Sequence, residues 1–347
     1  MDHFYSPQPV ETISLNVESS PVWEVILGIS GFTHSKLRHT FEFDETWTNQ
    51  VPRMPLSLQK NLKMIEETNS WYGMIMLQNE FSAQTIQEFS NGLREISRVT
   101  FYETLLPYLN RETEQIRKKT ALNYAKDGII AAYATYFEDH EFLAGYIRSL
   151  EEYGYENLCD LIRDTVQEWY EFVSKQQDWE KWCAALTYEQ KQHQSLDITA
   201  PTHEIERLTG GVLYYPEPSV WHVKLIPHVA YRPWVLEKRT HDTKLFFYPL
   251  NESYLLEPGV PSKELVRGHK ALGEELRLKL LYKILQGEVS LQEMSAYFNT
   301  SKTTLHHHLS LLKAAKFIRV EKGVYSVNLS QIHRFSDQLT QYLGTNE

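Results

Sequence analysis

A short segment near the C-terminus brings basic, hydroxyl and imidazole side chains together at helical spacing. In KTTLHHHLSLLKAAKF, which begins at Lys302, three leucines recur at i, i+4 and i+7 and predict one buried helix face. The outward positions of this helix are Lys302, Thr303, His306 and His307. All four side chains can donate hydrogen bonds to base edges or to phosphate oxygens, and the segment contains no acidic residue. This combination predicts contact with nucleic acid.

The residues before this segment carry clear helix end signals. An apolar helix stops at Gly287, which suits a C-cap position. Ser290 and Glu293 then form a capping box, in which each side chain can bond the other residue's backbone N–H, and they open the short helix LQEMSAYF. Asn299-Thr300 predicts a tight turn, and Ser301 is a good N-cap for the helix with the outward polar residues.

A β-hairpin is expected after that helix. The run FIRVEKGVYSVNL alternates apolar and polar residues around Gly323, which supplies a positive φ at the turn. Helix, capped helix, tight turn, polar-faced helix and hairpin, in this order, predict a winged helix-turn-helix, whose second helix presents its N-terminal residues to the major groove. We expect the position of the DNA backbone or of the hairpin to be set by four basic residues, Lys313, Lys316, Arg319 and Lys322. The predicted DNA-contacting residues are Lys302, Thr303, Thr304, His306, His307, Lys313, Arg319 and Lys322.

These segments together resemble the DNA-binding domain of ArsR-type transcriptional regulators. The run Ala271–Arg277 matches the family's opening of alanine, leucine, glycine or alanine, an acid and an arginine. Ser301–Leu309 is similar to its recognition-helix signature, with His306 in place of the usual serine. The resemblance covers roughly residues 265–330, and the first 250 residues are only loosely similar to the uncharacterised region of some long bacterial regulators.

The resemblance implies a regulator that represses by blocking polymerase. As a homodimer it would place two recognition helices in successive major grooves of double-stranded DNA at a palindromic operator. The alternative is a protein–protein interaction or scaffold module, in which the winged helix binds protein.

Metal sensing, common in this family, is not expected. The cysteine pair that many members carry before the turn is missing from Val289–Met294, and the second family site is represented only by His333 and Asp337, which we interpret as a surface pair. The run His306, His307 and His308 cannot converge on one ion, because consecutive helical residues point about 100° apart. We expect His308 to turn toward the neighbouring helix or the hairpin. The sequence therefore predicts no metal site and no cofactor.

Charge divides the chain into two unlike parts. Overall, 35 Lys and Arg oppose 45 Asp and Glu, a net charge of −10 that argues against a nucleic acid partner. From Ser262 onward, however, 12 basic residues face 8 acidic ones, a net of +4, whereas the preceding residues carry −14. A mildly basic DNA-binding module attached to an acidic body fits this pattern.

The N-terminal part is expected to be mostly helical. Alternating residues predict a strand near 11–18, periodic apolar residues predict about six helices over 56–195, and aromatic and β-branched runs predict two or three strands within 212–250. The fold class is therefore α+β, mostly α: an N-terminal helical body with a small β layer over 1–255, and a winged helix-turn-helix over 262–347.

No motif in the N-terminal part indicates catalysis, so we expect no enzyme activity and no catalytic residue. GxSxG, HExxH, P-loop and GxGxxG contexts are missing from the sequence. Cys159 and Cys183 are expected to be buried structural thiols. Dimerisation or sensing of a small-molecule effector is the expected role of this domain, with the binding residues unknown. Because neither a signal peptide nor a membrane span is indicated, we expect a cytoplasmic protein.

Overall fold

The residues described in the computed structural model, 13–34, 38–256, 259–321 and 323–344, divide into two units. Unit 1 comprises the chain up to Pro201 together with Pro216–Leu250. Unit 2 comprises Thr202–Tyr215 and the chain from Asn251 onward. The structure thus differs from the division expected from sequence, because residues 202–215 pack with the C-terminal residues although unit 1 flanks them on both sides in sequence.

Unit 1 consists of α-helices and a four-stranded sheet. Its α-helices are α1 (Pro21–Thr33), α2 (Asp44–Gln50), α3 (Leu56–Thr68), α4 (Trp71–Phe81), α5 (Ile86–Glu95), α6 (Arg98–Leu105), α7 (Glu114–Leu122), α8 (Ile129–Ala134), α9 (Leu143–Val173) and α10 (Trp179–Gln192). Short 3₁₀ turns lie at Arg38–Thr40, Val51–Arg53 and Thr135–Phe137. Eight α-helices, α3 to α10, therefore occupy the region where about six were predicted. Several are too short for a periodic pattern to resolve, and α9 is interrupted at Gly154, whose φ is +70°.

The sheet joins the start of unit 1 to its end. Its strands, β1 (Ser14–Val17), β2 (His222–His228), β3 (Leu236–Arg239) and β4 (Thr243–Pro249), lie in the order β1-β2-β4-β3. The β1–β2 and β2–β4 pairs are parallel, and β3–β4 is an antiparallel hairpin. The N-terminal strand therefore pairs with a segment more than 200 residues away.

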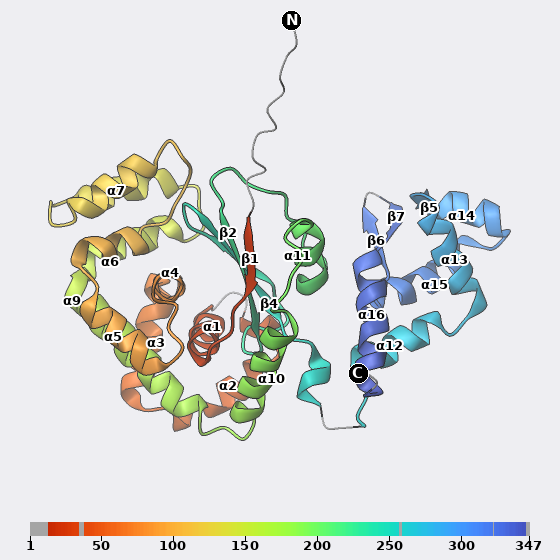
Figure 1. Cartoon of the computed structure of the whole chain (residues 1–347), viewed down its shortest axis with the longest axis horizontal. Helices are drawn as coiled ribbons and strands as arrows, with labels where there is room; N and C mark the ends of the chain where they lie inside the picture. The colour runs from red at the N-terminus through yellow and green to blue at the C-terminus, as the bar shows by residue number, and fades with distance from the viewer. Residues whose placement is uncertain (1–12, 35–37, 257–258, 322, 345–347) are drawn as a thin grey trace, which may run out of the picture. The chain divides into compact units, whose positions relative to one another are not determined.

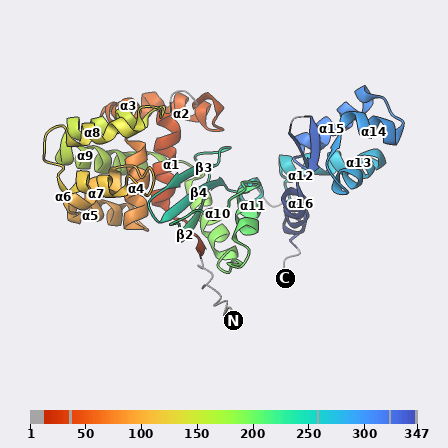
Figure 2. The same ribbon diagram turned by 90° about the horizontal axis from the view of Figure 1, so that it is seen from above.

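Helices cover both faces of this sheet, because successive strand residues point to opposite sides. Phe247 faces α1, where its ring lies 5.3 Å from that of Trp23. Its neighbour Tyr248 faces the other way and donates a hydrogen bond to the Glu189 carboxylate of α10 at 3.0 Å. Figures 1 and 2 show α1 between the sheet and the helices α3 to α9, with α10 on the other side of the sheet. The core thus lies around α1, which is buried along nearly its whole length.

Two buried ionisable groups lie where α1 meets the end of β2. The Glu24 carboxylate accepts hydrogen bonds from the backbone N–H groups of Val229 at 3.1 Å and Ala230 at 2.5 Å. Burial raises the pKa of Glu24 to about 7 despite these bonds. Burial lowers the pKa of the adjacent His228 to about 3, so its ring is neutral at physiological pH.

Unit 2 is a small helical domain with a three-stranded sheet. Its elements are α11 (Pro201–Thr209, all but its first residue), a 3₁₀ turn (Glu252–Leu255), α12 (Lys263–Leu272), α13 (Glu275–Leu285), β5 (Val289–Ser290), α14 (Leu291–Phe298), α15 (Lys302–Ala314), β6 (Ile318–Glu321), β7 (Val324–Val327) and α16 (Leu329–Tyr342). The strands lie in the order β5-β7-β6 and are antiparallel. A separate hydrophobic core, centred on Leu280, Met294, Leu305, Leu312 and Phe317, holds the unit together. The predicted fold class, α+β and mostly α with a C-terminal winged helix-turn-helix, is confirmed.

The thiols of unit 1 are held in their protonated form. Cys159 is buried and Cys183 is half-buried, and burial raises their pKa values to about 11 and about 12 respectively. In the described part of the chain no three His, Cys, Asp or Glu side chains form a metal-binding group. Within the same residues, no helix is both long and apolar enough to cross a membrane.

Candidate nucleic-acid interface

The helix α14 begins and ends at the residues that the sequence indicated, and α15 begins where it was expected but ends at Ala314, short of the predicted end. Ser290 accepts a hydrogen bond from the Glu293 N–H at 3.3 Å, and the Glu293 carboxylate accepts one from the Ser290 N–H at 2.8 Å, which completes the capping box of α14. The helix ends at Asn299, which takes a left-handed φ of +47°. Ser301 then caps α15 by accepting a hydrogen bond from the Thr304 N–H at 3.1 Å. These local bonds fix the turn between α14 and α15.

One side of α15 is anchored in the core of unit 2. The three leucines predicted to be inward, Leu305, Leu309 and Leu312, are buried. His308 is buried with them, and its Nδ1 lies 3.4 Å from both Glu274 Oε2 and Arg277 Nη1 of the α13 region. The inward orientation expected for His308 is thus confirmed.

Arg277 links α15 to the preceding helices. Its buried guanidinium donates to the backbone carbonyls of Lys270 at 2.8 Å and Ala271 at 2.5 Å and pairs with the Glu274 carboxylate. The two carbonyls lie at the C-terminal end of α12, where helix carbonyls lack partners within the helix. One side chain thus fastens the end of α12, the start of α13 and, through His308, the middle of α15.

The other side of α15 carries the predicted DNA contacts and is exposed. At 100° per residue, one face gathers Lys302, Thr303, His306, His307, Ser310 and Lys313, all of them exposed. Ser310 was missed from the sequence, although its spacing of four from His306 is the signal that could have revealed it. Its hydroxyl donates to the His306 carbonyl at 2.7 Å and can still accept. Thr304 is exposed as well, but it lies toward the edge of this face, with its hydroxyl 2.8 Å from that of Ser301.

The electrostatics of this face suit an anionic partner. α15 contains two lysines and no carboxylate, and its first turn adds the partial positive charge of a helix N-terminus. Hydroxyl, imidazole and ammonium groups on the same face can bond to phosphate oxygens and to base edges in the major groove. The face therefore combines groups that attract DNA with groups that can distinguish its bases.

The hairpin has the predicted form, but one of its two basic residues is already paired. β6 and β7 are antiparallel with Arg319 opposite Ser326, and Gly323 takes a φ of +82° at the turn. The half-buried Arg319 donates from Nη2 to Glu206 Oε1 at 3.0 Å and to Asn328 Oδ1 at 2.9 Å. Lys322 lies outside the described residues. Contact of Arg319 with DNA stays a prediction, and in this structure its charge is balanced by α11.

α11 is thereby fastened to the base of the hairpin. Glu206 Oε1 also accepts a hydrogen bond from the Ser330 hydroxyl at 2.7 Å. Burial acts to raise the pKa of Glu206, but the hydrogen bonds from Ser330 and Arg319 outweigh it and hold that pKa below its usual value. A glycine that follows α11 lets the chain approach this cluster: a Cβ on Gly211 would lie 3.1 Å from Arg319 Nη2. Sequence reasoning missed this contact, because Glu206 lies 113 residues before Arg319.

The comparisons with known proteins agree with this geometry. Residues 274–320, from the start of α13 to β6, match the family described as bacterial regulatory protein, arsR family. Comparison with curated proteins and with solved structures gives no match. The C-terminal unit therefore carries an ArsR-type helix-turn-helix, which indicates a role in DNA-binding transcription regulation.

Proposed function

We propose that this protein is a repressor that binds a palindromic operator as a homodimer, with α15 in the major groove. The observation that carries the proposal is the exposed face of α15, where lysine, hydroxyl and imidazole side chains gather and none is a carboxylate. A repressor of this kind occludes polymerase by occupying the operator.

The residues of this face divide between positioning and base recognition. Lys302 suits the O6 and N7 acceptors of guanine, and the methyl group of Thr303 suits the methyl group of thymine. His306 and His307 can donate to base acceptors one turn further along the helix, while Lys313 lies near the helix end, where phosphates pass. Each base contact is expected to contribute about 1–3 kcal/mol of discrimination.

A titration of operator binding tests the base contacts. Oligonucleotides selected for binding to the full chain supply the operator, and gel shifts over a range of salt concentrations compare wild type with Lys302→Ala and His306→Ala. Each variant is expected to weaken operator binding by about 1–3 kcal/mol and to relax the sequence preference at one position of each half-site. Lys270→Ala, which removes an exposed lysine from α12, is the matched control and should leave the preference unchanged. Unchanged affinity and preference in both α15 variants would overturn the assignment.

A second measurement tests the dimer and the palindrome. In a homodimer with two recognition helices, the selected sequence should contain two inverted half-sites about one helical turn apart. Sedimentation of the complex should give two chains for each operator. A single unrepeated site occupied by one chain would contradict this part of the proposal.

A groove on the other side of the helix-turn-helix favours the alternative function, in which the domain binds protein. α13 and α14 line an apolar hollow of about 480 Å³, and Leu278, Tyr282 and Tyr297 there are more than half exposed. Exposed apolar patches of this kind often mark protein contacts. Failure to bind any DNA at low salt, together with a stable protein complex lost in Tyr282→Ser, would favour this function over operator binding.

A further inference from the structure

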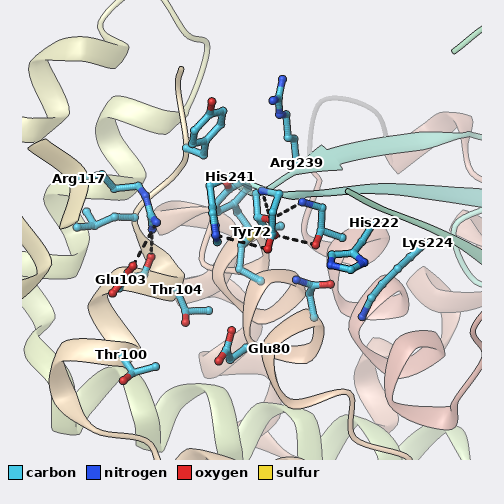
Figure 3. A pocket seen from close by; sticks show the side chains of 17 residues that line it. Tyr72, Glu80, Thr100, Glu103, Thr104, Arg117, His222, Lys224, Arg239 and His241 are labelled. Carbon is cyan, nitrogen blue, oxygen red and sulfur yellow. Dashed lines mark hydrogen bonds and ion pairs between the residues drawn. The ribbon is translucent and has the colours of Figure 1, made fainter. Parts of the chain in front are cut away.

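Unit 1 contains a polar pocket that the proposed DNA-binding function does not use. It has a volume of about 540 Å³, within the range of small-molecule sites, and lies between helices and the end of the sheet where β2 begins and the β3–β4 hairpin turns. Figure 3 shows its walls: Glu80, Thr100, Glu103 and Thr104 come from α4 and α6, whereas His222, Lys224, Arg239 and His241 come from β2 and the β3–β4 hairpin. Segments 100 or more residues apart in sequence thus form one cavity.

The helical wall of the pocket is acidic. Glu80 is exposed, and its carboxylate has no hydrogen-bond or ion-pair partner among the described residues. Glu103 faces the same space, and its Oε1 is 3.5 Å from Arg117 Nη2, a loose contact that leaves its other oxygen available. Thr100 and Thr104 add hydroxyl acceptors beside these carboxylates. Ammonium groups form their strongest hydrogen bonds with carboxylates in such a setting.

The sheet wall offers hydrogen-bond donors to a ligand, beside one carboxylate, Asp242. Lys224 Nζ lies 3.2 Å from Glu18 Oε1 and 3.5 Å from Ser82 Oγ, so two of its three donor hydrogens are engaged and one stays available. His222 uses Nδ1 to bond the Ser14 hydroxyl at 2.8 Å, which leaves its Nε2 without a partner in the described part of the chain. Donors on this side can bind a carboxylate or another small anionic group.

We propose that this pocket binds a small zwitterion of the amino acid or dipeptide class. Its ammonium group would lie against Glu80, and its carboxylate against Lys224 and His222. The unpaired Glu80 carboxylate lies on one side of the pocket, and the donors still available on Lys224 and His222 lie on the other. A ligand with a single charge would engage only one of these two sides. A ligand with both charges satisfies the two walls at once. The proposal goes beyond DNA binding, and its test uses no DNA, so either can fail without the other.

Ligand binding is measured by thermal unfolding and calorimetry on the full chain. The probes are the twenty protein amino acids and their glycyl dipeptides, each compared with its N-acetylated form and its C-terminal amide, which lack one of the two charges. At least one zwitterion should bind, and both single-charge derivatives of that probe should bind at least tenfold more weakly. If no zwitterion binds, or if the derivatives bind equally well, the proposal is wrong.

Paired variants locate the site. Glu80→Gln and Lys224→Gln should each raise the dissociation constant of that probe at least tenfold. The controls Glu95→Gln and Lys126→Gln make the same charge changes at exposed residues outside the pocket and should bind as wild type does. Because Lys224 also pairs with Glu18, circular dichroism checks its fold, and His222→Gln replaces it if that variant unfolds. Wild-type affinity in Glu80→Gln would overturn the assignment.

Discussion

Replacing Glu206 with glutamine is expected to strengthen DNA binding and to make it more dependent on salt. In the structure the Glu206 carboxylate balances the charge of Arg319 at 3.0 Å. The depressed pKa of Glu206 means that it is ionised at neutral pH, so the isosteric amide removes one negative charge and keeps the shape. Arg319 would then present an uncompensated charge at the base of the hairpin.

The size of both effects follows from the geometry. The two side chains are 21 % and 33 % exposed, so solvent screens the pair, and its loss should lower the stability of unit 2 by only about 1 kcal/mol. One additional phosphate contact steepens the slope of log affinity against log salt by about 0.9. Over the tenfold range from 1 M to 0.1 M salt, this additional slope of about 0.9 makes the variant bind about eightfold more tightly than wild type.

Fluorescence anisotropy of a labelled operator at several salt concentrations measures the slope. The double variant Glu206→Gln, Arg319→Gln should show no gain over Arg319→Gln alone, because the effect acts through the guanidinium. Glu288→Gln, the same charge change at an exposed residue of unit 2, is the control and should alter the slope little. An unchanged slope in Glu206→Gln, or an equal change in the control, would refute the inference that α11 withholds Arg319 from DNA.

Three further predictions concern stability and are measured by urea unfolding. Arg277→Met should destabilise unit 2 by about 3 kcal/mol, since two carbonyls at the end of α12 lose their donor, and a loss below about 1 kcal/mol would contradict the network. Because the unfolded chain protonates His228 more readily than the folded chain does, the free energy of unfolding of unit 1 decreases as the pH falls from 6.5 toward 3. Glu24 has the opposite effect, because its carboxyl group is protonated more readily in the folded chain, and it increases that free energy as the pH falls from 7 toward 4.5. Between pH 7 and 4.5, His228→Gln should therefore gain about 2 kcal/mol relative to wild type and Glu24→Gln should lose about as much; slopes of the same sign would refute this. Gly268→Ala places a Cβ 2.1 Å from a phenylalanine ring of α16 and should cost about 1–3 kcal/mol, whereas Gly145→Ala, with open space around it, should cost nothing.

The DNA-binding domain could be predicted from the sequence alone, because its signals are local. Capping residues such as Ser290 and Ser301, the leucine spacing of α15 and the glycine of the hairpin each act within a few residues, and the whole motif lies in one continuous stretch of chain. Helical periodicity also separated the inward His308 from the outward His306 and His307, since 100° per residue fixes which side chains share a face. The mostly helical class of the N-terminal part was predicted in the same way. The number of its helices was not, because several of them are too short to show a clear helical period.

The contacts between segments distant in sequence could not be predicted and appear only in the folded structure. Nothing near Arg319 in sequence indicates that Glu206 of α11 balances the charge of its guanidinium. In sequence, α11 is preceded and followed by residues of unit 1. The pocket is likewise assembled from α4, α6, α7, β2 and the β3–β4 hairpin, so the carboxylate of Glu80 and the donors of Lys224 and His222 come together only after folding. Such juxtapositions depend on which buried faces pack together, and periodicity predicts that a face is buried without specifying its partner.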